Sequence, residues 1–140
     1  MLLCRYAVSV AAPPDRAWSE IRDFQAIRDW HPAIGSCEIV RDGDDTIRVL
    51  TTRDGGGVLR EKRLEHDDAK RRYTYSILES PLPVSSYRST IEVRPAAGSG
   101  SRSLIVWQGR FDSPDAETAA KIVGGIYEAG LEGLRARLDG

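Results

Sequence analysis

The sequence predicts an α+β domain in which helices cover one face of an antiparallel sheet. Apolar and polar side chains alternate with a period of two over residues 2–11, and again over several segments between residues 36 and 112. Residues 15–30 instead carry apolar side chains at helical spacing, and residues 113–140 carry one long apolar stripe of the same kind. A strand, two short helices, a run of strands and a long helix together make an α+β layer.

Proline residues separate the first strand from the two short helices. Tyr6, Val8 and Val10 share one face of the first strand. In the turn "APPD" that follows, Pro14 suits the first turn of a helix, because the N–H that it lacks would have no partner there. Pro32 ends the second short helix, since the residue before a proline avoids the helical region.

Turn residues divide residues 36–112 into five or six strands. The connections are rich in Gly and Asp, as in "DGGG" and "AAGSGS", and glycine takes the positive φ that tight hairpins require. This pattern is typical of an antiparallel meander. The connection "ESPLP" holds two prolines, which indicates a stiffened loop that is either a rigid turn or a gate over a ligand.

The last segment is predicted to be a long helix, with Ser113 as its N-cap and Pro114 at its first helical position. Four glycines interrupt it, and each weakens a helix by up to ~1 kcal/mol relative to alanine. Their presence predicts close backbone packing or a bend. The apolar stripe consists of Ala116, Ala119, Ala120, Val123, Ile126, Tyr127, Leu131, Leu134 and Leu138.

Composition is that of an ordinary globular protein and excludes several function classes. The 140 residues predict one domain, residues 1–140, large enough to bury a core. The net charge of −1, with both signs interleaved, gives no field for nucleic acid. No apolar run approaches the ~20 residues of a membrane span. Arg5 interrupts the apolar start, so we expect no signal peptide and a cytoplasmic location.

Residues that commonly bind metals are few and scattered. Cys4, His31, Cys37 and His66 lack the spacing of a zinc site. We therefore expect no metal and no cofactor. Cys4 and Cys37 are expected to be small buried residues rather than a disulfide.

Three stretches carry a resemblance to a known family: "VSVAAPPDRAWSEIRDFQAIRDWHP", "LREKRLEHDDAKRRYTYSILESPLPVSSYRSTIEV" and "LIVWQGRFD". The chain resembles the START-like, or SRPBCC, superfamily over nearly its whole length, and looks most like the polyketide cyclase/dehydrase branch. The resemblance implies a helix-grip fold, with a curved antiparallel sheet of about six or seven strands, two short helices and a long C-terminal helix enclosing a cavity. Members bind lipids, sterols, hormones or polyketides, and some catalyse cyclisation or dehydration. The fold does not choose among these functions.

Strand parity and the helical stripe indicate the candidate ligand-binding residues. Bulky apolar side chains on a single strand face belong to the core or to a cavity wall. Trp30 is expected to anchor the short helices to the sheet as well. The candidates are Trp30, Tyr75, Tyr87, Trp107, Val123 and Tyr127.

Glu61, Arg63 and His31 are the candidate polar residues. The pattern "LREKRLE" does not decide which strand face points inward, and the resemblance favours the face with Glu61 and Arg63. A buried carboxylate needs a partner or a raised pKa, and we expect Arg63, His31 or a tyrosine hydroxyl to be that partner. The alternative for Glu61 is an exposed ion pair, and the alternative for His31 is a hydrogen bond to a backbone carbonyl.

Three functions are compatible with these residues. The leading hypothesis is a carrier or sensor that binds a small hydrophobic molecule, whose polar end His31, Glu61 and Arg63 orient. The second is a polyketide cyclase or dehydratase in which Glu61 or His31 moves a proton, since the ordinary pKa of histidine lies near ~6.5. The third is an interaction module that pairs two copies, and a monomer and a homodimer are equally compatible with the sequence.

Overall fold

The structure is a computed structural model that describes residues 1–139. Its seven strands form one antiparallel sheet in the order β1-β7-β6-β5-β4-β3-β2. Strands β2 to β7 follow one another as neighbours, whereas β1 pairs with β7 from the far end of the sequence. The strands are β1 (Leu2–Val10), β2 (Ile34–Asp42), β3 (Asp45–Thr52), β4 (Val58–Asp67), β5 (Arg72–Glu79), β6 (Ser85–Ala96) and β7 (Ser99–Asp112).

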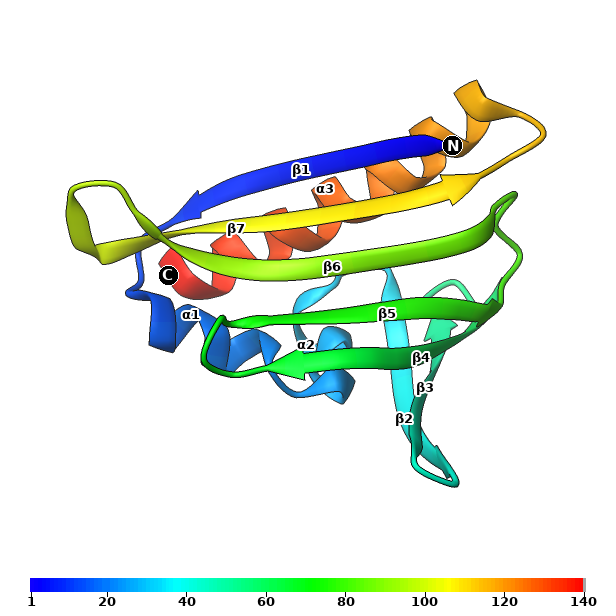
Figure 1. The fold of residues 1–140 in the computed structure, drawn as a ribbon, viewed down its shortest axis with the longest axis horizontal. Helices are drawn as coiled ribbons and strands as arrows, with labels where there is room; N and C mark the ends of the chain where they lie inside the picture. Colours follow the sequence, from blue (N-terminus) through cyan, green and yellow to red (C-terminus); the bar gives the residue numbers. More distant parts are fainter. Residues whose placement is uncertain (140) are drawn as a thin grey trace.

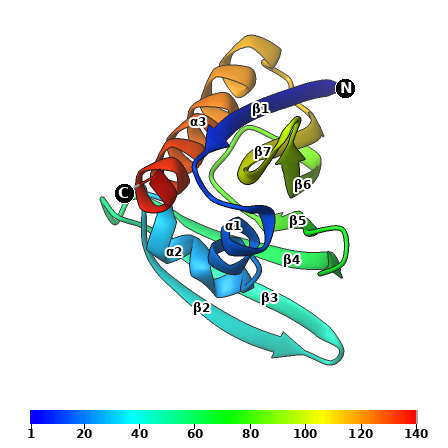
Figure 2. The ribbon, with the colours of Figure 1, turned by 90° about the vertical axis from the view of Figure 1, so that its left-hand side faces the viewer.

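The helices all lie on one side of this sheet. Two short helices and a 3-10 turn connect β1 to β2, and one long helix follows β7. Figure 1 shows the long helix running alongside β1 and β7, and in Figure 2 the strands form an arc with the helices at its open side. The helical segments are α1 (Pro14–Ile21), η1 (Phe24–Ala26), α2 (Ile27–Trp30) and α3 (Ala116–Asp139).

This architecture confirms the predicted α+β fold of a curved antiparallel sheet, short helices after the first strand and a long C-terminal helix. Within residues 1–139, none of the helices combines the length and the apolar character that a membrane crossing requires.

The long helix begins two residues later than predicted, at Ala116 rather than Pro114. The side chain of Asp115 caps it, because Oδ1 accepts the N–H of Thr118 at 3.2 Å. Ser113, the predicted N-cap, accepts the N–H of Asp115 within the preceding turn instead. Serine and aspartate are almost equally good caps, so the local sequence does not distinguish these two starts.

Three of the four glycines in α3 lie where the helix touches other elements. A Cβ on Gly130 would lie 2.7 Å from Cδ2 of His31 and equally close to Cζ3 of Trp107. Gly124 and Gly133 are similarly close to neighbouring atoms, whereas the fourth glycine faces open space. The predicted close backbone packing is therefore confirmed at three positions.

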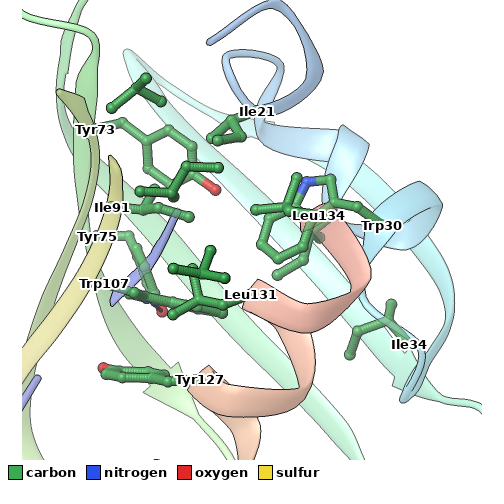
Figure 3. Packing of buried hydrophobic residues seen from close by; sticks show 14 of the residues in the cluster. Ile21, Trp30, Ile34, Tyr73, Tyr75, Ile91, Trp107, Tyr127, Leu131 and Leu134 are labelled. Carbon is green, nitrogen blue, oxygen red and sulfur yellow. Dashed lines mark hydrogen bonds between the residues drawn. The ribbon is translucent and has the colours of Figure 1, made fainter. Parts of the chain in front are cut away.

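The hydrophobic core lies between the concave face of the sheet and the helices. Figure 3 shows Tyr75 and Trp107 of the sheet opposite Leu131 of α3. All three side chains are buried. Cys4 and Cys37 are also buried, and both are free thiols.

Candidate functional site

An apolar cavity of about 120 Å³ lies between α3 and the concave face of the sheet. Its walls come from α2, from strands β2 to β7 and from α3. Pro81 and Leu82, in the proline-containing connection between β5 and β6, complete one side. The apolar walls include Ile27, Ile34, Leu50, Leu59, Ile77 and Val123.

The structure brings six of the nine predicted site residues together around this cavity. Three others lie elsewhere. The residues that line it are His31, Glu61, Tyr75, Tyr87, Trp107 and Val123. Those outside the lining are Trp30, Arg63 and Tyr127.

Trp30 and Tyr127 lie behind the wall and hold Trp107 in place. The ring of Tyr127 stacks on Trp107 with centroids 4.4 Å apart and an interplanar angle of 13°. Trp30 meets Trp107 edge to face, with centroids 5.6 Å apart. These two side chains therefore shape the cavity by supporting one of its walls.

Arg63 is on a different part of the molecule from the cavity. Its guanidinium carbon lies 5.9 Å from the ring centroid of Phe24. It lines a separate, more open depression together with Asp23 and Asp68. The family resemblance favoured the correct face for Glu61, but Arg63 lies farther along β4, beside Phe24 of η1.

Glu61 pairs with Arg48, a residue outside the predicted site. The two face each other in the register of β3 and β4, and Nε of Arg48 donates to Oε1 of Glu61 at 2.7 Å. Arg48 is 0% exposed and Glu61 is 5% exposed. Within residues 1–139, no hydrogen bond reaches the second carboxylate oxygen, Oε2. The expectation that Arg63, His31 or a tyrosine would pair with Glu61 is wrong.

The guanidinium of Arg48 is held by the core on every side. Its Nη1 donates to the carbonyl of Phe24 at 3.0 Å and to the hydroxyl of Tyr73 at 3.1 Å. The ring of Phe24 lies 4.0 Å from its carbon and that of Tyr75 lies 4.8 Å away. Nη2 is buried and has no hydrogen-bond partner among residues 1–139. Arg48 thus fixes Glu61 from behind and does not itself line the cavity.

Burial raises the pKa of the Glu61 carboxyl, and the charge and hydrogen bond of Arg48 oppose that rise. Arginine stays protonated, so a neutral Glu61 would leave Arg48 as an unpaired buried cation. The pair is therefore ionised near neutral pH. A carboxylate with one oxygen fixed and one unoccupied, in an apolar cavity, can accept a hydrogen bond or a proton from a bound molecule.

His31 lines the cavity, but backbone groups engage both of its ring nitrogens. Nε2 lies 2.8 Å from the carbonyl oxygen of Ile126, and Nδ1 accepts the N–H of Ala33 at 3.1 Å. These partners place the proton on Nε2, which donates to the carbonyl. Burial lowers the pKa of His31 and favours this neutral form. His31 thus adopts the alternative arrangement, a histidine bonded to a backbone carbonyl.

A chain of hydroxyl groups lies at the aromatic end of the cavity. Ser89 donates to the carbonyl of Gln108 at 3.0 Å, so its oxygen accepts from Tyr127 at 2.8 Å. The Tyr127 oxygen in turn accepts from Tyr87 through a short hydrogen bond. Tyr75 then donates to Tyr87 at 3.4 Å, the longest bond of the chain.

Trp107 fixes this chain to the sheet, and burial keeps its phenols neutral. Nε1 of Trp107 donates to Ser89 at 3.0 Å and to Tyr75 at 3.2 Å. Burial raises the pKa of Tyr75, Tyr87 and Tyr127. The side chains at this end therefore carry N–H and O–H groups, but these donors are already directed to partners in the protein.

Arg48 could have been found from strand phase. It lies two residues from Leu50 on β3, so both side chains point to the inward face of the sheet. When β3 is considered alone, an arginine is readily interpreted as an exposed residue, even where it shares a face with a buried leucine. The missing signal was the pairing of β3 with β4, which sets Arg48 opposite a carboxylate that needs a partner.

Within residues 1–139, no group of three or more histidine, cysteine, aspartate or glutamate side chains could hold a metal ion.

Comparison with known proteins identifies the family. The sequence model described as "Polyketide cyclase / dehydrase and lipid transport" matches residues 1–139. The chain belongs to this family. No curated protein sequence matches it significantly.

Several solved structures share the fold of this chain. The protein XoxI from Bacillus cereus has 31% identity and a TM-score of 0.92, over 99% of this chain and 96% of that one. The Zhui aromatase/cyclase from Streptomyces has 20% identity and a TM-score of 0.79, over 98% and 93%. A START superfamily protein from Mycobacterium smegmatis has 17% identity and a TM-score of 0.76, over 97% and 96%.

These comparisons confirm the predicted polyketide cyclase/dehydrase family and the helix-grip fold. The two structures below 25% identity support the fold alone. Membership of the polyketide cyclase/dehydrase family supports a role in binding a hydrophobic ligand or in cyclisation.

Proposed function

We propose that this protein binds a small hydrophobic molecule in the cavity between the curved sheet and α3, as a carrier or sensor. The observation that carries the proposal is the contrast between apolar walls and a single ionised side chain, Glu61, with an unoccupied oxygen. Pockets of this kind, mainly apolar with a few placed polar groups, are typical of small-molecule sites. The apolar walls supply affinity and Glu61 supplies orientation.

The size of the cavity limits what it holds without opening. About 120 Å³ is near the ~150 Å³ of an engineered apolar cavity that binds benzene, and below the ~300 Å³ where common ligand pockets begin. The cavity therefore fits one ring, and a larger ligand requires movement of a wall. Pro81 and Leu82 belong to a connection between strands and form the wall best placed to move.

A cavity-filling substitution tests the binding proposal. Ile77 lines the cavity and is half-buried, whereas its neighbour Leu78 is 47% exposed. Ile77→Trp is expected to abolish binding of single-ring probes such as toluene, phenol and cyclohexanol, measured by NMR titration of the full chain. Leu78→Trp is the matched control and is expected to bind as the original protein does. The proposal fails if none of the probes binds the unsubstituted protein.

The second candidate function is that of a cyclase or dehydratase, which the position of Glu61 favours. Its Oε2 could take a proton from a carbon next to a carbonyl group, with the electron pair moving onto the carbonyl oxygen. The N–H and O–H donors of the wall have partners already, and Tyr75, with its 3.4 Å hydrogen bond, is the donor least tightly held for an enolate oxygen.

Proton exchange tests this second function without knowledge of the substrate. Incubation of cyclohexanone with the protein in D₂O is expected to incorporate deuterium next to the carbonyl faster than in buffer alone. Glu61→Gln is expected to remove the acceleration, and Glu65→Gln, an exposed position on the same strand, is expected to retain it. An unaccelerated exchange in the presence of bound cyclohexanone argues for a binding protein.

A further inference from the structure

We propose that the ligand is a compact ring compound with a neutral hydroxyl group, whose O–H donates a hydrogen bond to Oε2 of Glu61. This inference rests on the proposed binding function and names the chemical class of its ligand. It comes from three properties of the cavity: the charge of its wall, the state of its donors and its volume.

The negative charge in the cavity wall favours a ligand that donates a hydrogen bond and excludes an anionic ligand. Among the described residues that line the cavity, Glu61 is the one ionised group, since His31 is neutral. The compensating charge, Arg48, sits behind Glu61 and outside the lining. A ligand carboxylate would therefore meet the carboxylate of Glu61 in a medium of low polarity, where repulsion between like charges is strong.

The hydrogen-bond donors near the cavity already have protein partners, whereas one acceptor does not. The N–H groups of His31 and Trp107 already donate to protein acceptors. The hydroxyl protons of Tyr87 and Tyr127 are committed along the chain that ends at the Gln108 carbonyl. Glu61 Oε2 is the opposite case: it is an acceptor to which no described residue donates, so a ligand can supply the hydrogen bond.

Because of Tyr75, a ligand hydroxyl fits this cavity better than a ligand group that can only donate a hydrogen bond. Its hydroxyl holds Tyr87 at 3.4 Å, so it can turn toward a ligand oxygen at little cost. Tyr75 and Glu61 both line the cavity and flank the same guanidinium, since Arg48 lies 4.8 Å from the Tyr75 ring and donates to Glu61. The negative charge of Glu61 adds to burial in raising the pKa of Tyr75. A ligand hydroxyl can donate to Glu61 and accept from Tyr75 at once.

The volume of the cavity limits the size of the rest of the ligand. About 120 Å³ accommodates one six-membered ring with the hydroxyl directed to Glu61 and the ring against Leu59, Ile77 and Val123. The inferred ligand is therefore a phenol or a cyclic alcohol rather than a free fatty acid.

Three probes of similar size test the inference: phenol, toluene and benzoate. Dissociation constants are measured by NMR titration of the full-length protein at neutral pH. Phenol is expected to bind about tenfold more tightly than toluene, the factor expected for a hydrogen bond to a charged acceptor less the added apolar burial of a methyl group. Benzoate is expected to show no binding at the concentrations where phenol saturates.

Substitutions assign the preference to Glu61. Glu61→Gln lowers the phenol-to-toluene ratio, and Glu65→Gln leaves it unchanged because that residue is exposed. Glu61→Gln leaves the buried cation Arg48 without its anion. A double variant, Glu61→Leu with Arg48→Met, therefore provides a second test of the role of Glu61, in which neither charge is present. It is expected to bind toluene at least as tightly as phenol.

The outcomes separate this inference from the function on which it rests. Equal binding of phenol and toluene, or preferential binding of benzoate, overturns the inference while leaving a hydrophobic binding site. A phenol preference that survives in the double variant overturns it as well. Failure of all three probes to bind contradicts the proposed function itself.

Discussion

Gly130 of α3 lies against His31, so close that a methyl group at its Cα would come within 2.7 Å of the imidazole Cδ2. The same methyl group would lie 2.7 Å from the Trp107 ring. Both side chains line the cavity. The packing of the long helix thus determines where two walls of the candidate site lie.

Gly130→Ala is expected to destabilise the protein by about 1–2 kcal/mol, because overpacking costs more than the gain in helix propensity returns. Gly125→Ala in the same helix meets no atom within 4 Å and is expected to stabilise it by up to ~1 kcal/mol. Urea denaturation measures both. Equal effects of the two substitutions would show that Gly130 is not a packing position.

Stability is expected to fall on acidification because His31 is buried in its neutral form. Burial, aided by the charge of Arg48 and opposed by the bond to Ile126, lowers its pKa in the folded state below the ordinary 6.5. The unfolded chain therefore takes up a proton first. The stabilisation is fully present above pH 6.5 and is lost as pH falls toward the folded-state pKa, by at most ~1.4 kcal/mol per pH unit.

His31→Gln is expected to flatten this pH dependence below pH 6.5, measured as the free energy of unfolding across a pH series. His66→Gln is the control, since His66 lies on β4 beside Asp68 and outside the cavity lining. An unchanged slope in His31→Gln would assign the acid sensitivity to another group.

The buried pair of Arg48 and Glu61 is expected to behave as a unit. Glu61→Leu alone leaves a buried cation and should cost about 3–5 kcal/mol, whereas adding Arg48→Met should recover most of that loss. Chemical denaturation of the two single variants and the double variant gives the coupling energy. A double variant no more stable than Glu61→Leu would contradict strong coupling.

Tyr127→Phe is expected to destabilise the protein by about 1–3 kcal/mol, because the buried hydroxyls of Tyr87 and Ser89 lose their partner. Tyr6→Phe, at a β1 residue that is 37% exposed, should be close to neutral because none of the described residues hydrogen-bonds its hydroxyl. Thermal unfolding distinguishes the two. The ring of Tyr127 remains stacked on Trp107 in the variant, so a loss of stability reports the hydroxyl chain.

Much of the fold followed from local patterns. Pro14 does begin α1, and Pro32 follows the end of α2 at Trp30. The start of α3 was misplaced because Ser113 and Asp115 are both good caps, and the choice between them depends on the turn from β7.

The candidate site was only partly predictable, because some of its contacts depend on which residues of neighbouring strands lie opposite each other. Tyr75, Tyr87 and Trp107 follow from strand alternation, which assigns each side chain to a face. Arg48 was missed because its role depends on the register between β3 and β4. Alternation also says nothing of position along a strand, so it grouped Arg63 with Glu61 although Arg63 lies beside Phe24 of η1 and outside the cavity lining.

The sequence by itself determined the order of elements and the residue types available to a pocket. The tertiary structure decided which groups meet: Arg48 with Glu61, His31 with the Ile126 carbonyl, and Tyr127 with Trp107. The physical reason is that side-chain periodicity is a property of one strand or helix. Hydrogen bonding, desolvation and cavity volume arise only when several such elements pack together.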